Sequence, residues 1–304
     1  MRNNKFFLLF IVMLIGFGIS INAQDLLETL EKEYPDVPQY EIATFKSTRI
    51  AIGHSIENRK EGVLQVMAMN RYWNIPNYQG QSFIADKWSA RIALEYGISN
   101  RLSTGFGWTT LEDVYDGFLK YNLLRQRKKS KKSFVSVTLF QNASYRSESE
   151  GRSPIYGGFE DTSFSDRLAF TTQVLIARKF TPQFSAQISP TFIHRGSSLS
   201  DEDPNNHFAI GIGGRYKVGG HVSIVSEYYY VANPIKSADT YGAFALGVNW
   251  ELSDLMLQFH MTNAWSTVED VFITQTPNNF NLQDGNFTFG FTATFALHLK
   301  QKQP

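Results

Sequence analysis

The chain has 304 residues, 29 Lys and Arg against 28 Asp and Glu, a formal net charge of +1, and no Cys. The balanced charge disfavours a nucleic-acid-binding protein, because such proteins carry a basic field. The lack of Cys excludes disulfides, thiolate metal clusters, a cysteine nucleophile and a lipid-modified N-terminal cysteine. Aromatic residues make up 14% of a chain whose mean hydropathy is only −0.25, which suggests apolar residues sorted onto one face of β-strands.

Residues 1–23 have the pattern of a secretory signal. Arg2 and Lys5 precede an apolar stretch, and Ala23 supplies a small residue before the expected cut. The alternative is an uncleaved membrane anchor, but the stretch is shorter than the roughly 20 apolar residues that a spanning helix needs. We expect cleavage before Gln24. No later segment is apolar for long enough to predict a transmembrane helix.

Residues 24–60 are predicted to be an N-terminal segment that precedes the main fold. Residues 25–33 can form one or two turns of an amphipathic helix, which Pro35 and Pro38 end. Residues 43–52 resemble a strand and are too regularly patterned for a linker. We expect this segment to act as a plug at or inside the mouth of the fold that follows.

Residues 61–300 are predicted to form a transmembrane antiparallel up-and-down β-barrel, which makes the fold class all-β. Apolar and polar residues alternate with a period of two, most clearly near the end, where we expect Phe289 and Phe291 to face lipid and Thr292 to face the lumen. A soluble antiparallel sandwich shows the same alternation. The long segments and the Gly, Ser, Thr, Asn and Gln residues on the polar face favour a barrel.

The connections between these segments alternate in length. Short turns are expected at 99–101, 129–131, 181–183, 219–220 and 253–254, and long connections at 74–86, 146–166, 195–206, 232–240 and 265–285. Short periplasmic turns that alternate with long extracellular loops are typical of outer-membrane barrels. The turn signals give about 12 strands, an even number that returns both ends of the barrel to the periplasm. A barrel of 14 strands, which would include part of residues 41–60, is the alternative.

Several strings of residues carry a resemblance to a known family. They are Phe45–Ile50 (FKSTRI), Gly53–Glu57 (GHSIE), Tyr115–Gln126 (YDGFLKYNLLRQ), Leu175–Phe180 (LIARKF), Gly213–Lys217 (GGRYK) and Gln258–Asn263 (QFHMTN). Together they resemble a Bacteroidota family of outer-membrane β-barrel proteins defined as a domain of unknown function. The resemblance covers the chain from about residue 40 onward. It implies a barrel in the outer membrane of a Gram-negative cell, and it implies no substrate.

The polar face of the strands and the N-terminal segment carry the residues that we expect inside the barrel. The candidates for pore or plug contacts are Lys46, Arg49, Arg91, Glu95, Lys120, Arg167, Arg215, Asn249, Glu251 and His260. Charges in a barrel interior must be paired or hydrated. Mixed signs therefore predict either a narrow polar pore or a lumen closed by ion pairs. We expect Arg49 to pair with a wall carboxylate such as Glu95 or Glu251.

No motif in the sequence implies a cofactor. The six His residues lack the close spacing of a zinc site. Asp201, Asp203 and Asn205 resemble the start of a calcium loop and are candidates for metal ligands. The loop lacks the glycine and the bidentate Glu that an EF-hand needs, so a polar surface loop is the simpler interpretation.

An enzyme is disfavoured. His260, Asn263 and Ser266 lie close in the sequence, yet strand alternation puts His260 and Asn263 on opposite faces, whereas a catalytic triad needs contact between its members. The one basic cluster, residues 125–132, lies in a predicted turn. Hydration or contact with anionic phospholipid is expected there, and no nucleic acid.

The sequence therefore predicts a non-enzymatic outer-membrane barrel, either a narrow channel or a small-solute transporter of unknown substrate. The alternative is a sealed structural or interaction barrel that acts through its extracellular loops, and an outer-membrane hydrolase comes third. The expected partners are outer-membrane lipid, lipopolysaccharide, which divalent ions would bridge to the acidic loops, and the barrel-assembly machinery. Neither the solute nor the oligomeric state follows from the sequence.

Overall fold

The computed structural model describes residues 39–74, 85–128, 133–147, 163–281 and 286–299. Residues 41–304 form one compact unit, to which the description below applies. The expected signal and the expected N-terminal helix lie outside the described residues, as does part of the basic cluster. No helix in the described part of the chain is long and apolar enough to cross a membrane.

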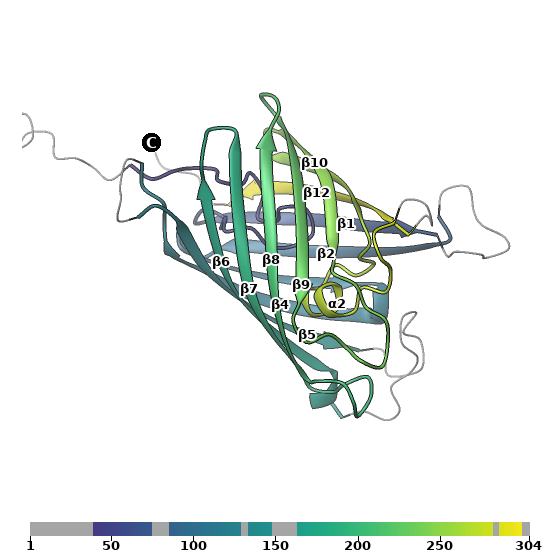
Figure 1. The fold of residues 1–304 in the computed structure, drawn as a ribbon. Helices are drawn as coiled ribbons and strands as arrows, with labels where there is room; N and C mark the ends of the chain where they lie inside the picture. The colour runs from purple at the N-terminus through teal and green to yellow at the C-terminus, as the bar shows by residue number, and fades with distance from the viewer. Residues whose placement is uncertain (1–38, 75–84, 129–132, 148–162, 282–285, 300–304) are drawn as a thin grey trace, which may run out of the picture. The chain divides into compact units, whose positions relative to one another are not determined.

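In the described part of the chain, twelve antiparallel strands close into a barrel. Figure 1 shows how the strands are arranged. They are β1 (Val63–Trp73), β2 (Lys87–Gly97), β3 (Leu102–Thr109), β4 (Val114–Leu124), β5 (Ser136–Arg146), β6 (Leu168–Lys179), β7 (Phe184–Arg195), β8 (Asn206–Lys217), β9 (Val222–Val231), β10 (Phe244–Leu252), β11 (Leu255–Thr262) and β12 (Thr288–His298). Each strand pairs with its neighbours in sequence, and β1 pairs with β12 to close the ring. The prediction of 12 strands is confirmed, and the alternative of 14 is wrong.

The alternation of residues along each strand separates an apolar outer surface from the lumen. Large apolar side chains such as Trp88, Phe106 and Phe289 are exposed on the outside, whereas Thr138 and Gln258 are buried on the inside. A closed barrel leaves no strand edge unpaired, so every ladder can be satisfied within the hydrocarbon of a bilayer. The sorted surface and the closed ring together give a barrel that fits a membrane.

The two ends of the barrel differ. The connections after β2, β4, β6, β8 and β10 lie at one end of the barrel, which we call the short-turn end. The start of β1 and the end of β12 lie at the same end. The opposite, long-loop end carries the connections after the odd-numbered strands. Its short 3-10 turns are η1 (Leu111–Asp113) and η2 (Ser165–Arg167), and its connection from β11 to β12 contains the helix α2 (Glu269–Thr274).

Residues 43–52 do not form the strand that their pattern predicts. They run through a series of bends, with one isolated bridge between Arg49 and His54. The prediction failed because this backbone pairs with polar side chains of the barrel wall and not with a neighbouring strand: Glu227 accepts from the N–H of Ile52, and Gln258 donates to the carbonyl oxygen of Ile50. The segment therefore lies within the lumen as an irregular loop.

Candidate functional site

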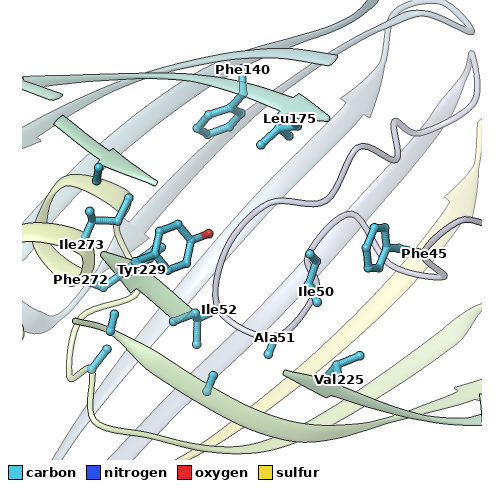
Figure 2. Close-up of a cluster of buried hydrophobic side chains, with 14 of the residues drawn as sticks. Phe45, Ile50, Ala51, Ile52, Phe140, Leu175, Val225, Tyr229, Phe272 and Ile273 are labelled. Atoms are coloured by element: carbon cyan, nitrogen blue, oxygen red, sulfur yellow. The ribbon is translucent and has the colours of Figure 1, made fainter. Parts of the chain in front are cut away.

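Two segments enter the lumen from opposite ends of the barrel. We call residues 45–56 the lumenal loop, which comes from the short-turn end, and α2 comes from the long-loop end. Figure 2 shows Ile50 and Ile52 of the lumenal loop and Phe272 of α2 within one group of buried side chains. The candidate functional site is therefore the lumen and the segments that fill it.

The tip of the lumenal loop is held by one carboxylate of the wall. Glu227, buried on β9, accepts hydrogen bonds at Oε2 from the backbone N–H groups of Ala51, Ile52 and Gly53, at 2.8, 2.6 and 3.1 Å. Successive N–H groups in a turn form a concave site for an anion, which the carboxylate fills. Glycine is needed at position 53 because a Cβ there would collide with the hydroxyl oxygen of Tyr229.

The rest of the loop backbone is bound by polar wall side chains. Their donor atoms reach carbonyl oxygens of the loop: Gln187 to His54 at 2.8 Å, Thr138 to Ile56 at 3.1 Å, and Asn249 and Gln258 to Ile50 at 3.1 and 3.0 Å. Two more bind the residues that flank the loop: Arg215 donates to Thr44 at 3.2 Å and Lys120 to Glu57 at 2.6 Å. Irregular backbone inside a barrel needs such partners, because a buried peptide group without one is costly. The polar face of the strands thus serves as a binding surface for the loop.

Arg49 joins the lumenal loop to α2. Its Nη1 donates to the carbonyl oxygen of Ile52 at 2.6 Å and lies 2.9 Å from Oε1 of Glu269. Both side chains are buried. The expected pairing of Arg49 with Glu95 or Glu251 is therefore wrong, because the loop reaches far enough into the lumen for its Arg to meet an acid from the opposite end.

His54 lies at the same junction. Its ring packs between those of Phe118 and Phe140, with ring centroids 4.7 and 4.3 Å away. Its Nε2 is 3.6 Å from Oε1 of Glu269. The aromatic wall of β4 and β5 therefore holds the imidazole beside the carboxylate that also meets Arg49.

A second carboxylate ties α2 to the wall. Asp270 accepts a hydrogen bond from Oγ of Ser144 at 2.9 Å and lies 3.6 Å from Nη1 of Arg195 and 3.9 Å from Nη2 of Arg146. Arg146 also pairs with Glu112 of η1 at 2.8 Å. The neighbouring Glu269 and Asp270 thus bind different sets of cations, one in the lumenal loop and one in the barrel wall.

Apolar packing joins the same three parts. Ile50 and Ile52 of the loop, Phe272 of α2 and wall residues such as Leu175 are all buried in one cluster. Tyr229 of β9 packs edge-to-face on Phe272, with centroids 5.3 Å apart. An apolar cluster of this size inside a barrel excludes water, so the described lumen is filled through its middle.

Two further buried pairs line the wall. Arg91 of β2 binds Asp116 of β4 through both terminal nitrogens of its guanidinium, and the Nη2–Oδ2 distance is 2.7 Å. Arg71 of β1 contacts Nε2 of His260 on β11, and its Nε and Nη2 have no partner among the described residues. Glycine at position 290 leaves room for the ring of His260, because a Cβ at this position would overlap the ring.

A cavity remains at the short-turn end. Its volume is about 670 Å³, and its lining includes Asn100 and Ser253 of the short turns together with Phe45 and Lys46 of the lumenal loop. We call it the vestibule. It ends where the loop begins, so it leads from the short-turn end to the plug.

The predicted lumenal residues other than Arg49 fall into three groups. Arg91, Glu95, Lys120, Arg215, Asn249 and His260 are buried at inward positions of the strands. Lys46 and Glu251 form an ion pair of 3.0 Å at the vestibule. Arg167 does not lie on a lumen-facing strand position as expected: it belongs to η2, one residue before β6 begins, and its Nη1 donates to the carbonyl of Ser147 at 3.3 Å.

The acidic loop that contains the candidate metal ligands is held by hydrogen bonds to another connection. Asp203 accepts hydrogen bonds from the backbone N–H groups of Lys236 and Ser237, at 2.7 and 3.0 Å, and from the hydroxyl of Ser237. Asp201 and Asn205 are exposed. Among the described residues no three His, Asp or Glu side chains gather as a metal site would require. Asp203 therefore fastens one long-end connection to the next.

The candidate triad residues each have other partners. His260 contacts Arg71, Asn263 donates to the carbonyl of Gly242 at 2.9 Å, and the hydroxyl of Ser266 accepts from the N–H of Val268 at 3.2 Å. The described contacts therefore contain no nucleophile–base pair among these three.

Sequence reasoning missed the acids that organise the lumen. Glu227 lies on the polar face of a predicted strand, and its parity could have identified it as lumenal. Glu269 and Asp270 lie in a long connection without periodicity, where no signal shows that the chain turns back into the barrel. Arg71 also lies on an inward position of β1 and was overlooked.

The outward apolar surface, the closed ring and the plugged lumen define a membrane-bound β-barrel protein. The chain belongs to the family described as membrane-bound beta barrel domain, DUF5777, which matches residues 45–297. No curated protein sequence matches the chain.

Three solved structures are similar in fold. A NanC porin has a TM-score of 0.47 and 12% identity over 78% of this chain and 100% of its own. A KdgM porin has a TM-score of 0.47 and 8% identity over 77% and 99%. An outer membrane channel from Pseudomonas putida F1 has a TM-score of 0.46 and 11% identity over 79% and 97%. Such distant likenesses carry no argument about what this chain transports or binds.

Proposed function

We propose that the protein is a channel for small polar solutes, closed in the described state by the lumenal loop and α2. The observation that carries the proposal is the vestibule of about 670 Å³, which leads to a loop that is bound by side chains and belongs to no strand ladder. Such a loop can leave while all twelve barrel ladders stay paired. The barrel is then the wall of a pore and the loop is its plug.

We further propose that the barrel lies in a Gram-negative outer membrane and reaches it after removal of residues 1–23. The charged start and apolar stretch of the chain support export. Most turns at one end are short and most connections at the other are longer, the exceptions being residues 125–135 and 110–113. This distribution supports a barrel whose short-turn end faces the periplasm. The resemblance of the strings near residues 45–57 to Bacteroidota barrels agrees with this location. The exposed aromatic side chains would contact outer-membrane lipid.

The proposed role is non-catalytic. His260, Asn263 and Ser266, the candidate triad residues, form hydrogen bonds with groups other than one another. Polar lumenal side chains that bind backbone suit a surface that holds and releases a plug.

Planar-bilayer recordings test the channel. We compare the wild-type protein with a variant in which a short Gly-Ser linker replaces residues 45–56, after heat-modifiability gels show that both barrels are folded. The wild type should be mostly closed with brief openings, and the variant should show a large steady conductance. A folded variant that never conducts would overturn the channel.

The second candidate is a sealed barrel that acts through its long-end loops. The buried apolar cluster and the ion pair between Arg49 and Glu269 favour it, because together they fill the middle of the lumen. The same recordings separate the two candidates, since a sealed interaction barrel stays silent whether or not its lumenal loop is loosened.

A further inference from the structure

We infer that the solutes of this channel carry carboxylates, and that the two acids of α2 occupy the position of such a solute in the closed barrel. The inference rests on the proposed channel function. It names the class of solute from the charges that α2 meets inside the lumen.

Buried cations in the lumen outnumber the buried carboxylates of the wall. The cations are Arg49, Arg71, Arg91, Lys120, Arg195 and Arg215. The wall carboxylates are Glu95, Asp116 and Glu227. A further acid, Glu112, lies on η1 and pairs with Arg146 at the long-loop end. Because unbalanced buried charge is costly, the closed lumen requires additional anions, and Glu269 and Asp270 supply them.

The contacts of these two acids form a site for a pair of carboxylates. Glu269 meets the cation of Arg49 at 2.9 Å and accepts from the amide of Asn142 at 3.1 Å. Asp270 accepts from the hydroxyl of Ser144 at 2.9 Å and lies 3.6 Å from the cation of Arg195. Each carboxylate therefore has at least one cation and one neutral donor, and Asp270 also has Arg146 at 3.9 Å. Cations and neutral donors are the partners that recognise a carboxylate. The two neutral donors lie two residues apart on β5 and face the lumen together.

Arg71 extends the cationic lining beyond this site. No carboxylate among the described residues pairs with it, and its Nε and Nη2 have no partner. A guanidinium cannot lose its charge in a protein, so it attracts anions whenever the lumen is hydrated. When α2 moves aside, a solute thus meets more cations than acids along the wall.

The test is the charge selectivity of the opened channel. We record reversal potentials in a KCl gradient for the wild type and for the double variant Glu269→Gln and Asp270→Asn. The variant should open more often than the wild type, and its reversal potential should shift toward that of chloride. The matched control is Asp201→Asn with Glu202→Gln, which removes two neighbouring acids from an exposed loop and should leave opening and selectivity unchanged.

The outcomes separate the inference from the proposed function. An open variant that prefers potassium, or that shows no preference, overturns the anionic solute while the channel stands. Silence from this variant and from the variant without the lumenal loop, with both barrels folded, overturns the channel and the inference with it.

A second measurement leaves Glu269 and Asp270 unchanged. It tests the inference even if the double variant does not fold. The chain has no Cys, so Ser266→Cys introduces a single thiol that is buried beside α2. Citrate should compete with the α2 acids and speed labelling of this thiol by a neutral maleimide, compared with KCl at equal ionic strength. Equal rates in the two salts would overturn the inference. Gly220→Cys, in an exposed turn, controls for the effect of citrate on the reagent.

Discussion

One oxygen atom of Glu227 accepts three hydrogen bonds from the tip of the lumenal loop. Its Oε2 accepts from Ala51, Ile52 and Gly53, so its loss leaves three buried donors unpaired at once. Each unpaired buried donor costs about 1–3 kcal/mol. We expect Glu227→Ala to release the loop tip, to raise the open probability in single-channel recordings and to lower the free energy of unfolding.

Glu251→Ala is the comparison for this variant. Glu251 also binds the N-terminal segment, through Lys46, but both side chains are about 30% exposed. Pairs of this kind contribute about 0–1 kcal/mol. Its open probability should therefore stay close to that of the wild type. If the two variants opened equally often, the tip contact with Glu227 would not be what holds the plug.

Asp203 predicts a pH dependence at the long-loop end. Burial opposes its ionisation, but the hydroxyl and N–H of Ser237 and the N–H of Lys236 donate to the carboxylate and hold its pKa below the usual 3.8. A carboxyl with a lowered pKa stabilises the folded state fully above its unfolded pKa. This stabilisation is lost as the pH falls through the folded value. The contact between the connections 196–205 and 232–243 should therefore persist down to the usual carboxyl pKa and weaken below it.

The measurement is an NMR titration of the 13C-labelled Asp203 carboxyl in detergent micelles. Its midpoint should lie below 3.8, and the amide signals of Lys236 and Ser237 should broaden over the same range. Asp203→Asn should remove this transition. A midpoint above 3.8 would contradict the hydrogen-bonded carboxylate.

Successive residues of strand β12 alternate between the lipid-facing and the lumen-facing side of the barrel. Phe291 faces outward and packs on Phe259 with centroids 5.1 Å apart, whereas Thr294 faces inward and lines the vestibule. A cation on the lipid face near mid-membrane costs about 2–4 kcal/mol. Phe291→Arg should therefore reduce the folded band in heat-modifiability gels, and Thr294→Arg should have little effect because its side chain can extend into the vestibule.

Thr292 faces the lumen, as expected, but Thr292→Arg is not a suitable control for Phe291→Arg. It is buried where the lumen is filled, so an Arg there would be overpacked and would add a buried charge. Equal losses from Phe291→Arg and Thr294→Arg would show that the two faces of β12 are assigned wrongly.

Strands were predictable from the sequence because a lipid-facing residue must be apolar at every second position. The lumenal loop and α2 were not, because their partners lie far away in the chain and follow no period. One signal was available in the strands themselves. Phe118, Phe140, Leu175 and Ile193 lie on the otherwise polar parity, and they are the wall residues that pack against the inserted segments. Large apolar residues on the inner face of a barrel therefore indicate that its lumen is occupied.

For the molecule as a whole, the ring of strands is complete without the lumenal loop. Every strand, including β1 and β12, pairs on both sides, and the loop contributes no ladder. The bonds between the loop and the barrel wall are made by wall side chains, so the loop can detach while the barrel remains folded. This separation predicts that the loop becomes accessible to water under conditions that leave the barrel intact.

A single introduced thiol reports this movement. Ser55 is buried in the loop, and its hydroxyl donates to the carbonyl of Ser47 at 2.7 Å, so Ser55→Cys is a small change in a chain without thiols. A membrane-impermeant thiol reagent should label it slowly in the wild-type background and much faster together with Glu227→Ala, while Gly220→Cys reacts quickly in both. Heat-modifiability gels on the same samples must show folded barrels. If the thiol introduced by Ser55→Cys stayed unreactive in a channel that conducts, solutes would pass beside a fixed loop, and the loop would be part of the pore wall.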